Sequence, residues 1–236
     1  MNLGRRALFV RFIGCNLTCG YPQPPRTAGA PAEGAMRCDT EYTWNAAKHD
    51  LGAGRHLSAA EIWSELLQLD PATTNPALPP VDLIVVSGGE PLMRTDTVLY
   101  LARQARSTGR RLEVETNATI APVGDLIDAG VSFNAGLKLA SSAVPRAKRI
   151  KPAAIAALRS TGRTRWKFVI TGPDDLDEVA ALQDEFALTG IWLSPEGVTR
   201  QAVIDRMRMV ADEALARGWN LTTRQHVLIW GDERGK

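Results

Sequence analysis

Short apolar runs alternate with amphipathic helical stretches along most of the chain. Residues 8–13 form the first run, and residues 82–86 (DLIVV) form a continuous apolar run typical of a strand buried on both faces. Residues 57–69 have the apolar spacing of a helix, with Ser58 and Glu61 placed as a capping box. Further strands are expected at 111–116, 131–134, 165–170, 191–193 and 219–223, and further helices at 96–107, 123–129, 153–160, 174–186 and 201–217.

The repeated strand–helix unit indicates the fold class. Alternating strands and helices with short connections predict an α/β fold, a complete or partial barrel of parallel strands with outer helices. We expect residues 1–236 to form a single domain. Residues 20–37 (GYPQPPRTAGAPAEGAMR) show no periodicity and are rich in Pro, Gly and Ala, so they are expected to be a surface insertion.

Composition narrows the class of protein. A hydrophobic fraction of 44% is ordinary for a globular protein, and a net charge of +2 gives no support to nucleic acid or an anionic membrane as partner. No apolar run approaches the ~20 residues of a membrane span, and the first apolar stretch is short for a secretory signal. A cytoplasmic location is therefore expected, and three cysteines, an odd number, argue against a disulfide scaffold.

All three cysteines lie after the first expected strand, as Cys15-x3-Cys19-x18-Cys38. Loops after the strands of a parallel barrel form its active-site face, and thiolates are the ligands preferred by iron–sulfur clusters and zinc. Three cysteines on a four-iron cluster leave one iron open to a substrate or cofactor. The spacing alone is also compatible with a zinc site completed by His49 or His56, and with three unrelated buried thiols.

Polar residues follow the next two strands. Residues 87–91 (SGGEP) follow the most apolar strand, where two glycines permit close backbone approach and Glu90 adds a carboxylate. Residues 115–117 (ETN) end the following strand. Alone, these are a common glycine turn and a polar strand end that caps a helix; together, they indicate one pocket.

The combination of residues 14–19 (GCNLTC), 38–40 (CDT), 87–91 and 115–117 resembles the radical S-adenosylmethionine (SAM) family 7-carboxy-7-deazaguanine synthase (QueE). The similarity extends over nearly the whole chain, through residues 41–44 (EYTW), 167–169 (KFV), 195–197 (PEG), 220–226 (NLTTRQH) and 230–234 (WGDER).

The resemblance implies a truncated radical SAM barrel, a homodimer and a carbon–nitrogen lyase. Family members convert 6-carboxy-5,6,7,8-tetrahydropterin into 7-carboxy-7-deazaguanine, with loss of ammonia, on the route to queuosine. They use a [4Fe-4S] cluster, SAM and Mg²⁺, with an electron donor such as flavodoxin or ferredoxin. One electron from the cluster cleaves SAM, and the resulting radical removes hydrogen from the pterin.

Carried onto this sequence, the resemblance makes Cys15, Cys19 and Cys38 the cluster ligands and Thr40 the Mg²⁺ contact, which would otherwise be a turn cap. Arg11 matches an arginine that pairs with the pterin carboxylate, with an exposed strand residue as the alternative; for His226 the alternative is a core histidine. The SAM-binding positions carried over are Asp39, Gly89, Glu90, Lys138, Ser194, Pro195, Glu196 and Gly197. The substrate-binding positions carried over are Arg11, Ser87, Glu115, Asn117, Arg224 and His226.

Four positions depart from the family pattern. Residues 20–37 separate cysteines that are usually adjacent in Cys-x3-Cys-x2-Cys, and closing such a loop costs little extra with length. The family's QGEG-type segment would precede Met1. Its Ser-Pro-Lys is Gly136-Leu137-Lys138 here, and the glycine of its ETNGT is Ala118. These changes keep two alternatives open: a radical SAM enzyme with another substrate, and a non-catalytic, zinc-binding descendant.

Overall fold

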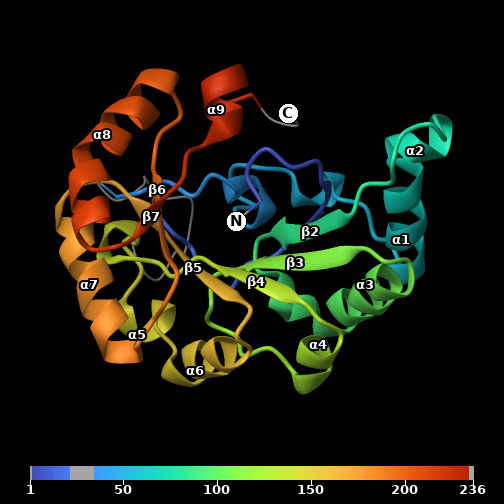
Figure 1. Cartoon of the computed structure of the whole chain (residues 1–236), viewed down its shortest axis with the longest axis horizontal. Helices are drawn as coiled ribbons and strands as arrows, with labels where there is room; N and C mark the ends of the chain where they lie inside the picture. Colours follow the sequence, from blue (N-terminus) through green and yellow to red (C-terminus); the bar gives the residue numbers. More distant parts are fainter. Residues whose placement is uncertain (1, 22–34, 234–236) are drawn as a thin grey trace.

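The computed structural model describes residues 2–21 and 35–233. Within them the chain forms a seven-stranded sheet in the order β1 to β7, in which every neighbouring pair is parallel. This order confirms the expected α/β fold, with β1 and β7 as the two edges of the curved sheet (Figure 1). The strands are β1 (Leu8–Phe12), β2 (Leu83–Gly88), β3 (Arg111–Thr116), β4 (Ser132–Ala135), β5 (Thr164–Ile170), β6 (Ile191–Pro195) and β7 (Asn220–Leu221).

The helices follow one another around the outside of the sheet (Figure 1), and α1 contacts β1 whereas α8 contacts β7. The α-helices are α1 (Ala59–Gln68), α2 (Pro71–Thr74), α3 (Thr95–Ser107), α4 (Gly124–Asp128), α5 (Arg146–Arg149), α6 (Pro152–Ser160), α7 (Asp174–Phe186), α8 (Arg200–Ala216) and α9 (Gln225–Trp230). Short 3-10 turns are η1 (Glu41–Thr43), η2 (Leu51–Ala53), η3 (Pro91–Arg94) and η4 (Ala140–Ser142).

The main hydrophobic core lies between the sheet and the helices, and the strand pattern separates the two faces. In β5, Trp166, Phe168 and Ile170 are buried in this core, whereas Val169 packs on the opposite, concave face against the cysteine region. Because side chains alternate along a strand, Lys167 shares the concave face with Val169. The concave face therefore carries polar and charged groups above a conventional outer core.

The expected long elements are confirmed, including the capping box in which the Ser58 hydroxyl accepts from the Glu61 amide and Glu61 bonds back to Ser58. The expected strand over 219–223 is shorter, because only Asn220 and Leu221 pair with β6 before the chain enters α9. The short helices α2, α5 and α9 were not predicted. Each spans six residues or fewer, too short for a helical period to stand out.

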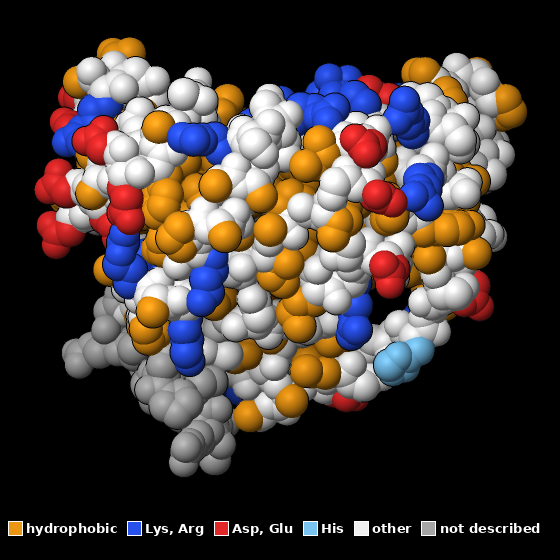
Figure 2. Space-filling model, turned by 90° about the horizontal axis from the view of Figure 1, so that it is seen from below, with side chains coloured by type: hydrophobic (Ala, Val, Ile, Leu, Met, Phe, Trp, Pro, Cys, Tyr) orange, Lys and Arg blue, Asp and Glu red, His pale blue; other side chains and the backbone are white. Residues whose placement is uncertain are grey.

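The surface mixes side-chain types. On the face shown in Figure 2, hydrophobic, basic and acidic side chains are interspersed. None of the described helices combines the length and the apolar character that a membrane crossing requires. Of the expected insertion at 20–37, residues 22–34 lie outside the described part of the chain.

A buried ion pair fixes where β2 and β3 begin. Asp70, 2% exposed, accepts hydrogen bonds from the amides of Ala72 and Val81 at 3.0 Å each and from Arg110 at 2.9 Å. Burial works to raise the pKa of Asp70, but these hydrogen bonds and the Arg110 charge lower it below its ordinary 3.8. Since Val81 precedes β2 and Arg110 precedes β3, Asp70 aligns the strands whose far ends carry SGGEP and ETN.

We expect Asp70→Asn to lower the free energy of unfolding by about 2 kcal/mol at pH 7, because a buried charged acceptor with three donors is lost. A carboxyl with a lowered folded pKa stabilises above its unfolded pKa, and this contribution disappears as pH falls through the folded value. The gap from wild type, measured by urea unfolding, should therefore close below pH 3.8. Asp82→Asn is the control: this carboxylate is 51% exposed, so its loss should change stability by about 0.5 kcal/mol or less. Equal losses in the two variants would contradict the assignment.

Candidate active site at the carboxyl ends of the strands

The two arms of the insertion are fastened to one turn. The amide of Gly20 donates to the carbonyl of Ser142 at 2.8 Å, and the amide of Met36 donates to the carbonyl of Ser141 at 2.7 Å. Gly20 has φ +88°, and a Cβ there would lie 2.8 Å from the Met36 carbonyl oxygen. The chain therefore leaves and returns at the same place, so the insertion does not separate Cys19 from Cys38.

A buried arginine holds this turn in place. Arg149 donates to the carbonyls of Lys138 at 2.7 Å and Val144 at 3.1 Å, and pairs with Glu178 at 2.7 Å. Its side chain is only 5% exposed, so all these bonds lie in a low-dielectric setting where they are strong. Arg149 thus ties the residues on either side of η4 together and to α7, and the Ala140 amide of η4 donates to the same Glu178 at 2.6 Å.

The three thiols and one ammonium share a small volume. Cys19 packs with Leu17, Met36 and Val144, and Cys15 and Cys38 lie against the same cluster. Burial raises the pKa of Cys19 to about 12, with Lys138 acting to lower it and the other two thiols to raise it. Burial also raises the pKa of Cys15. For Lys138, burial acts to lower the pKa, but the three thiols and Asp39 raise it overall.

The donor set fits a cluster bound by three thiolates. Soft sulfur ligands are what such clusters require, and Lys138 would offset part of their negative charge. Three N–H groups are directed at these sulfurs: the Leu17 amide at 3.4 Å and the Asn117 side-chain amide at 3.9 Å from Cys15 Sγ, and the Trp44 indole at 3.5 Å from Cys38 Sγ. Within residues 2–21 and 35–233, no three side chains of His, Cys, Asp or Glu converge as a single metal ion requires. In a cluster each thiolate binds its own iron atom, so the sulfurs stand further apart.

The SGGEP loop packs directly on the cysteine loop. The amide of Gly89 donates to Phe12 at 3.0 Å, and the amide of Glu90 donates to Gly14 at 2.9 Å. A Cβ on Gly89 would lie 1.9 Å from the Gly14 carbonyl oxygen, so only glycine fits. Thr40, which follows Cys38-Asp39, donates to the Gly88 carbonyl at 3.3 Å and lies 3.5 Å from the Cys38 sulfur. Its hydroxyl thus lies between the two loops.

Glu90 connects SGGEP to ETN. Its carboxylate is 1% exposed and accepts from the amides of Leu92 at 3.0 Å and Asn117 at 2.7 Å and from the Thr116 hydroxyl at 2.8 Å. Burial raises the pKa of Glu90 although these bonds oppose the rise. In this structure Glu90 therefore braces two strand ends with both of its oxygens.

Two further substrate-binding candidates bond to each other, and a third reaches the cysteine loop. The Ser87 hydroxyl of β2 donates to Glu115 of β3 at 2.5 Å. The Asn117 amide donates to Asn16 at 2.8 Å and lies 3.9 Å from Cys15 Sγ. These contacts join the ends of β1, β2 and β3 into one polar rim, as the sequence predicts.

Basic groups from distant segments meet around Asp39. Arg224 donates to Asp39 at 3.2 Å and to the Gly197 carbonyl at 2.8 Å. The Asp39 side chain is 63% exposed, so desolvation raises its pKa little, and Arg224, then Lys167, Lys138 and Arg11, lower it overall. The structure therefore pairs a predicted SAM-binding residue with a predicted substrate-binding residue.

His226 belongs to the same basic group. Partial burial, then Arg224, lowers the pKa of His226, with smaller contributions of the same sign from Lys167 and Arg11. Lys167 was not among the predicted site residues. Its place between the buried Trp166 and Phe168 is the signal that indicates the concave face.

The remaining SAM-binding candidates, Ser194 to Gly197, end β6. Ser194 is 4% exposed on the concave face, and Glu196 pairs with Arg206 of α8 at 2.7 Å. The Glu196 amide donates to Ile170 at 2.9 Å, so this turn is fixed to the end of β5.

Arg11 lines a pocket at the surface. The pocket has a volume of about 410 Å³. It is lined by Arg11, Ile13, Tyr42, Thr43, His49, Asp50, Ala53 and Gly54. His49, one of the zinc ligands considered from the sequence, faces this pocket and lies 4.0 Å from Glu41. The pocket gives a bound anion access to Arg11 from the solvent side.

Of the three substituted positions, Gly136 and Ala118 differ in their consequences. A Cβ on Gly136 would meet nothing closer than 3.6 Å, so the serine of the family pattern would fit there and glycine is not required. Ala118, in contrast, has φ +61° and is 1% exposed. An L-residue costs roughly 1 kcal/mol in this conformation, so glycine suits that position better than the alanine present.

We expect Gly89→Ala to lower the free energy of unfolding by about 2–3 kcal/mol, because a methyl group must displace the Gly14 backbone. Chemical denaturation measures this loss. Gly124→Ala is the matched control: nothing lies within 4 Å of a Cβ there, so stability should stay level or rise by up to about 1 kcal/mol. Equal stability of Gly89→Ala and wild type would show that the two loops are not in contact.

Comparisons with known proteins agree with this geometry. A 7-carboxy-7-deazaguanine synthase of Pyrobaculum aerophilum is 29% identical over 239 residues, covering 100% of this chain and 91% of that protein. Another, of Bradyrhizobium diazoefficiens, is 32% identical over 177 residues, covering 75% of this chain and 77% of that protein. No protein-family model matches the chain.

The fold comparison points the same way. The crystal structure of QueE from Escherichia coli aligns with a TM-score of 0.58 at 18% identity, covering 94% of this chain and 86% of that chain. That likeness concerns the fold, a partial barrel of parallel strands with outer helices. With relatives that match along most of both chains, the chain belongs to the 7-carboxy-7-deazaguanine synthase family.

Proposed function

We propose that the chain is a radical SAM lyase that converts 6-carboxy-5,6,7,8-tetrahydropterin into 7-carboxy-7-deazaguanine with loss of ammonia. The observation that carries the proposal is the convergence of Cys15, Cys19 and Cys38 beside the SGGEP loop, in a chain that belongs to this family. When bound, a four-iron cluster with SAM on its open iron supplies the one-electron cleavage that starts such reactions.

The residues around the thiols have two roles: some bind the cluster or SAM, and Lys138 balances charge. Cys15, Cys19 and Cys38 hold the cluster, and Lys138 offsets the negative charge of the thiolates. The backbone at Gly89 lies against the cysteine loop, where a bound SAM would meet it. Asp39, Glu90 and the turn from Ser194 through Pro195 and Glu196 to Gly197 complete the SAM site, Glu90 by holding the two loops together.

The concave face supplies groups that suit an anionic heterocycle. Arg11 binds the pterin carboxylate in bidentate fashion, which its planar guanidinium favours. Ser87, Glu115 and Asn117 offer hydrogen-bond partners along the ends of β2 and β3 for the ring edge.

The Asp39 cluster supplies the rest of the substrate site. Lys167 and Arg224 add positive potential around Asp39, and His226, whose pKa is lowered, offers a neutral ring nitrogen beside them. The substrate carboxylate and the Mg²⁺ ion would bind here, next to Thr40. A hydroxyl oxygen is an acceptable ligand for Mg²⁺, whose other positions are filled by substrate and water.

The family also sets the expected context. The enzyme acts as a cytoplasmic homodimer and receives electrons from a flavodoxin or ferredoxin. These three properties rest on the family alone.

Anaerobic incubation of the reconstituted protein with SAM, Mg²⁺, a reductant and the carboxypterin tests the proposal. We expect both 5′-deoxyadenosine and 7-carboxy-7-deazaguanine, identified by mass spectrometry. Production of 5′-deoxyadenosine without the deazapurine acid, together with turnover of another heterocycle or peptide, would show a radical SAM enzyme with a different substrate. Colourless protein that holds one zinc ion and cleaves no SAM would show a non-catalytic descendant.

Two variants separate the roles of sulfur and hydroxyl. Cys19→Ala should lose at least ~90% of iron, sulfide and SAM cleavage, because one corner of the cluster loses its only protein ligand. Thr40→Ala should keep the iron content of wild type and raise the Mg²⁺ concentration needed for half-maximal rate several-fold. Iron analysis and a Mg²⁺ titration check this pair, and equal loss of iron in both variants would contradict the assignment.

A further inference from the structure

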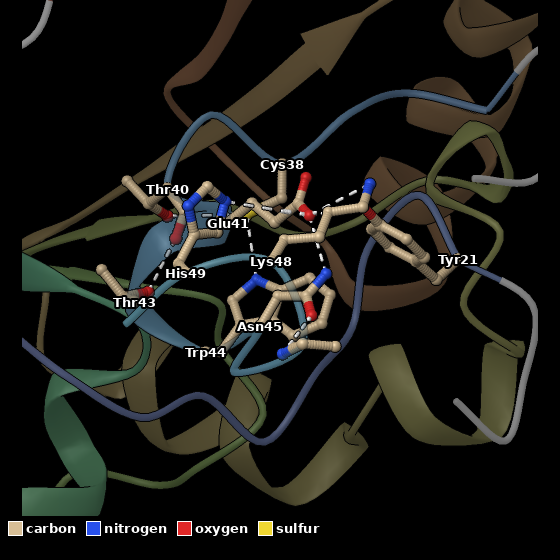
Figure 3. A network of polar contacts seen from close by, with 10 residues as sticks. Tyr21, Cys38, Thr40, Glu41, Thr43, Trp44, Asn45, Lys48 and His49 are labelled. Carbon is tan, nitrogen blue, oxygen red and sulfur yellow. Dashed lines mark hydrogen bonds and ion pairs between the residues drawn. The ribbon is translucent and has the colours of Figure 1, made fainter. Parts of the chain in front are cut away.

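An indole N–H is directed at one of the three sulfurs. Trp44 Nε1 lies 3.5 Å from Cys38 Sγ, within hydrogen-bonding distance for a sulfur acceptor (Figure 3). The indole N–H is a donor only, so the direction of this bond is unambiguous. Thr40 also approaches Cys38 at 3.5 Å, but its hydroxyl already donates to the Gly88 carbonyl. Trp44 is therefore the donor committed to the Cys38 sulfur.

A network of polar contacts holds the indole in this orientation. The ring of Tyr21 packs edge-on against Trp44 with centroids 5.4 Å apart and an interplanar angle of 86°. Tyr21 is 4% exposed, and its hydroxyl bonds to Glu41 and accepts from Lys48 at 2.5 Å (Figure 3). Asn45 donates to the same Glu41 carboxylate at 2.7 Å. Glu41 thus accepts hydrogen bonds from both Tyr21 and Asn45, which fixes the position of its carboxylate.

The network spans the base of the insertion. Tyr21 comes two residues after Cys19, at the start of the insertion. Glu41, Trp44 and Lys48 come after Cys38, beyond its end. Contact between the two arms thus positions the third thiol, which the insertion would otherwise leave dependent on a long loop. Lys48 also lies 4.9 Å from the Tyr21 ring centroid, close enough for a cation–π contact that adds to the clamp.

We propose that Trp44 positions the Cys38 sulfur and, through its N–H, raises the reduction potential of the bound cluster. A donor to a ligating sulfur stabilises the reduced state most, because that state carries the larger negative charge. The inference rests on the cluster of the proposed function and not on the identity of the substrate. It assigns a role to Trp44 and to its support, Tyr21.

Trp44→Phe tests the proposal, because phenylalanine keeps a ring against Tyr21 and lacks the N–H. The full chain is reconstituted with iron and sulfide, and the cluster is titrated with reductant and followed by EPR in the absence of SAM and substrate. We expect iron content like that of wild type and, at the wild-type midpoint, at least a threefold lower ratio of reduced to oxidised cluster. For one electron this corresponds to a midpoint about 28 mV more negative, at 59 mV per tenfold change.

Trp63→Phe is the matched control. Trp63 is a buried tryptophan of α1 in the main core, away from the thiols, and its replacement should leave the midpoint unchanged. A Trp44→Phe midpoint equal to that of wild type would overturn the role of Trp44 while leaving the proposed function intact. A wild-type protein that takes up no cluster would instead overturn the proposed function.

A second measurement uses wild-type protein, so it does not depend on a variant folding correctly. Wild-type protein labelled with ¹⁵N-tryptophan and reduced should show a ¹⁵N hyperfine coupling to the cluster in pulsed EPR. If Trp44→Phe takes up no iron, this coupling decides: its presence supports the N–H···S bond, and its absence overturns it.

Discussion

The attachment of both insertion arms to one turn is the constraint on which the rest of the site depends. Gly20 and Met36 donate to neighbouring carbonyls of the 140–142 turn, and buried Arg149 holds that turn against the Lys138 carbonyl. Without these bonds, the 18 residues between Cys19 and Cys38 would leave the position of the Cys38 thiol relative to the other two undefined. With these bonds, the number of residues between Cys19 and Cys38 has little influence on the distance between the two thiols. These backbone hydrogen bonds offset the entropy cost of closing the loop.

The neighbouring loops depend on close backbone contact in the same way. Gly89 lies against Gly14, and Glu90 bridges to the end of β3, so the cysteine loop, SGGEP and ETN form one unit. This arrangement explains why thiols, a glycine turn and polar side chains lie next to each other at the ends of the consecutive strands β1, β2 and β3. On the concave face, Lys138 lies beside the three thiols, and Arg224, Lys167 and Arg11 act on Asp39. The rim therefore has one region of thiols with a single lysine and a second region that is rich in cations.

Much of this could be predicted from the sequence, for local reasons. Residues 83–86 (LIVV) are apolar at every position, which is typical of a strand buried on both faces. Ser58 and Glu61 have the spacing of a capping box, which marks the start of a helix. The rule that parallel strands end at one edge was enough to bring Ser87 next to Glu115. Ala118 was recognised as a departure, and the observed φ +61° shows that this backbone position does favour glycine.

Other features depend on tertiary contacts that have no local pattern. Asp39 and Arg224 were both expected in the site, but nothing in the sequence indicates that these residues, 185 positions apart, bond to each other. Lys167 and Trp44 were noted only within short segments that resemble the family, and no role was predicted for either. A single lysine in a strand and a single tryptophan after a turn have many possible roles. The short helices α2 and α9 pack against α1 and α8, contacts that no local pattern reveals.

The central claim is that three thiols converge to hold a single four-iron cluster with one open iron. The Mössbauer spectrum of the wild-type protein reconstituted with ⁵⁷Fe tests it most directly, before and after addition of SAM. The account predicts the signal of one [4Fe-4S] cluster per chain, in which one iron site alone shifts when SAM binds. Iron in isolated sites or two-iron clusters, or a four-iron signal that SAM leaves unchanged, would contradict it.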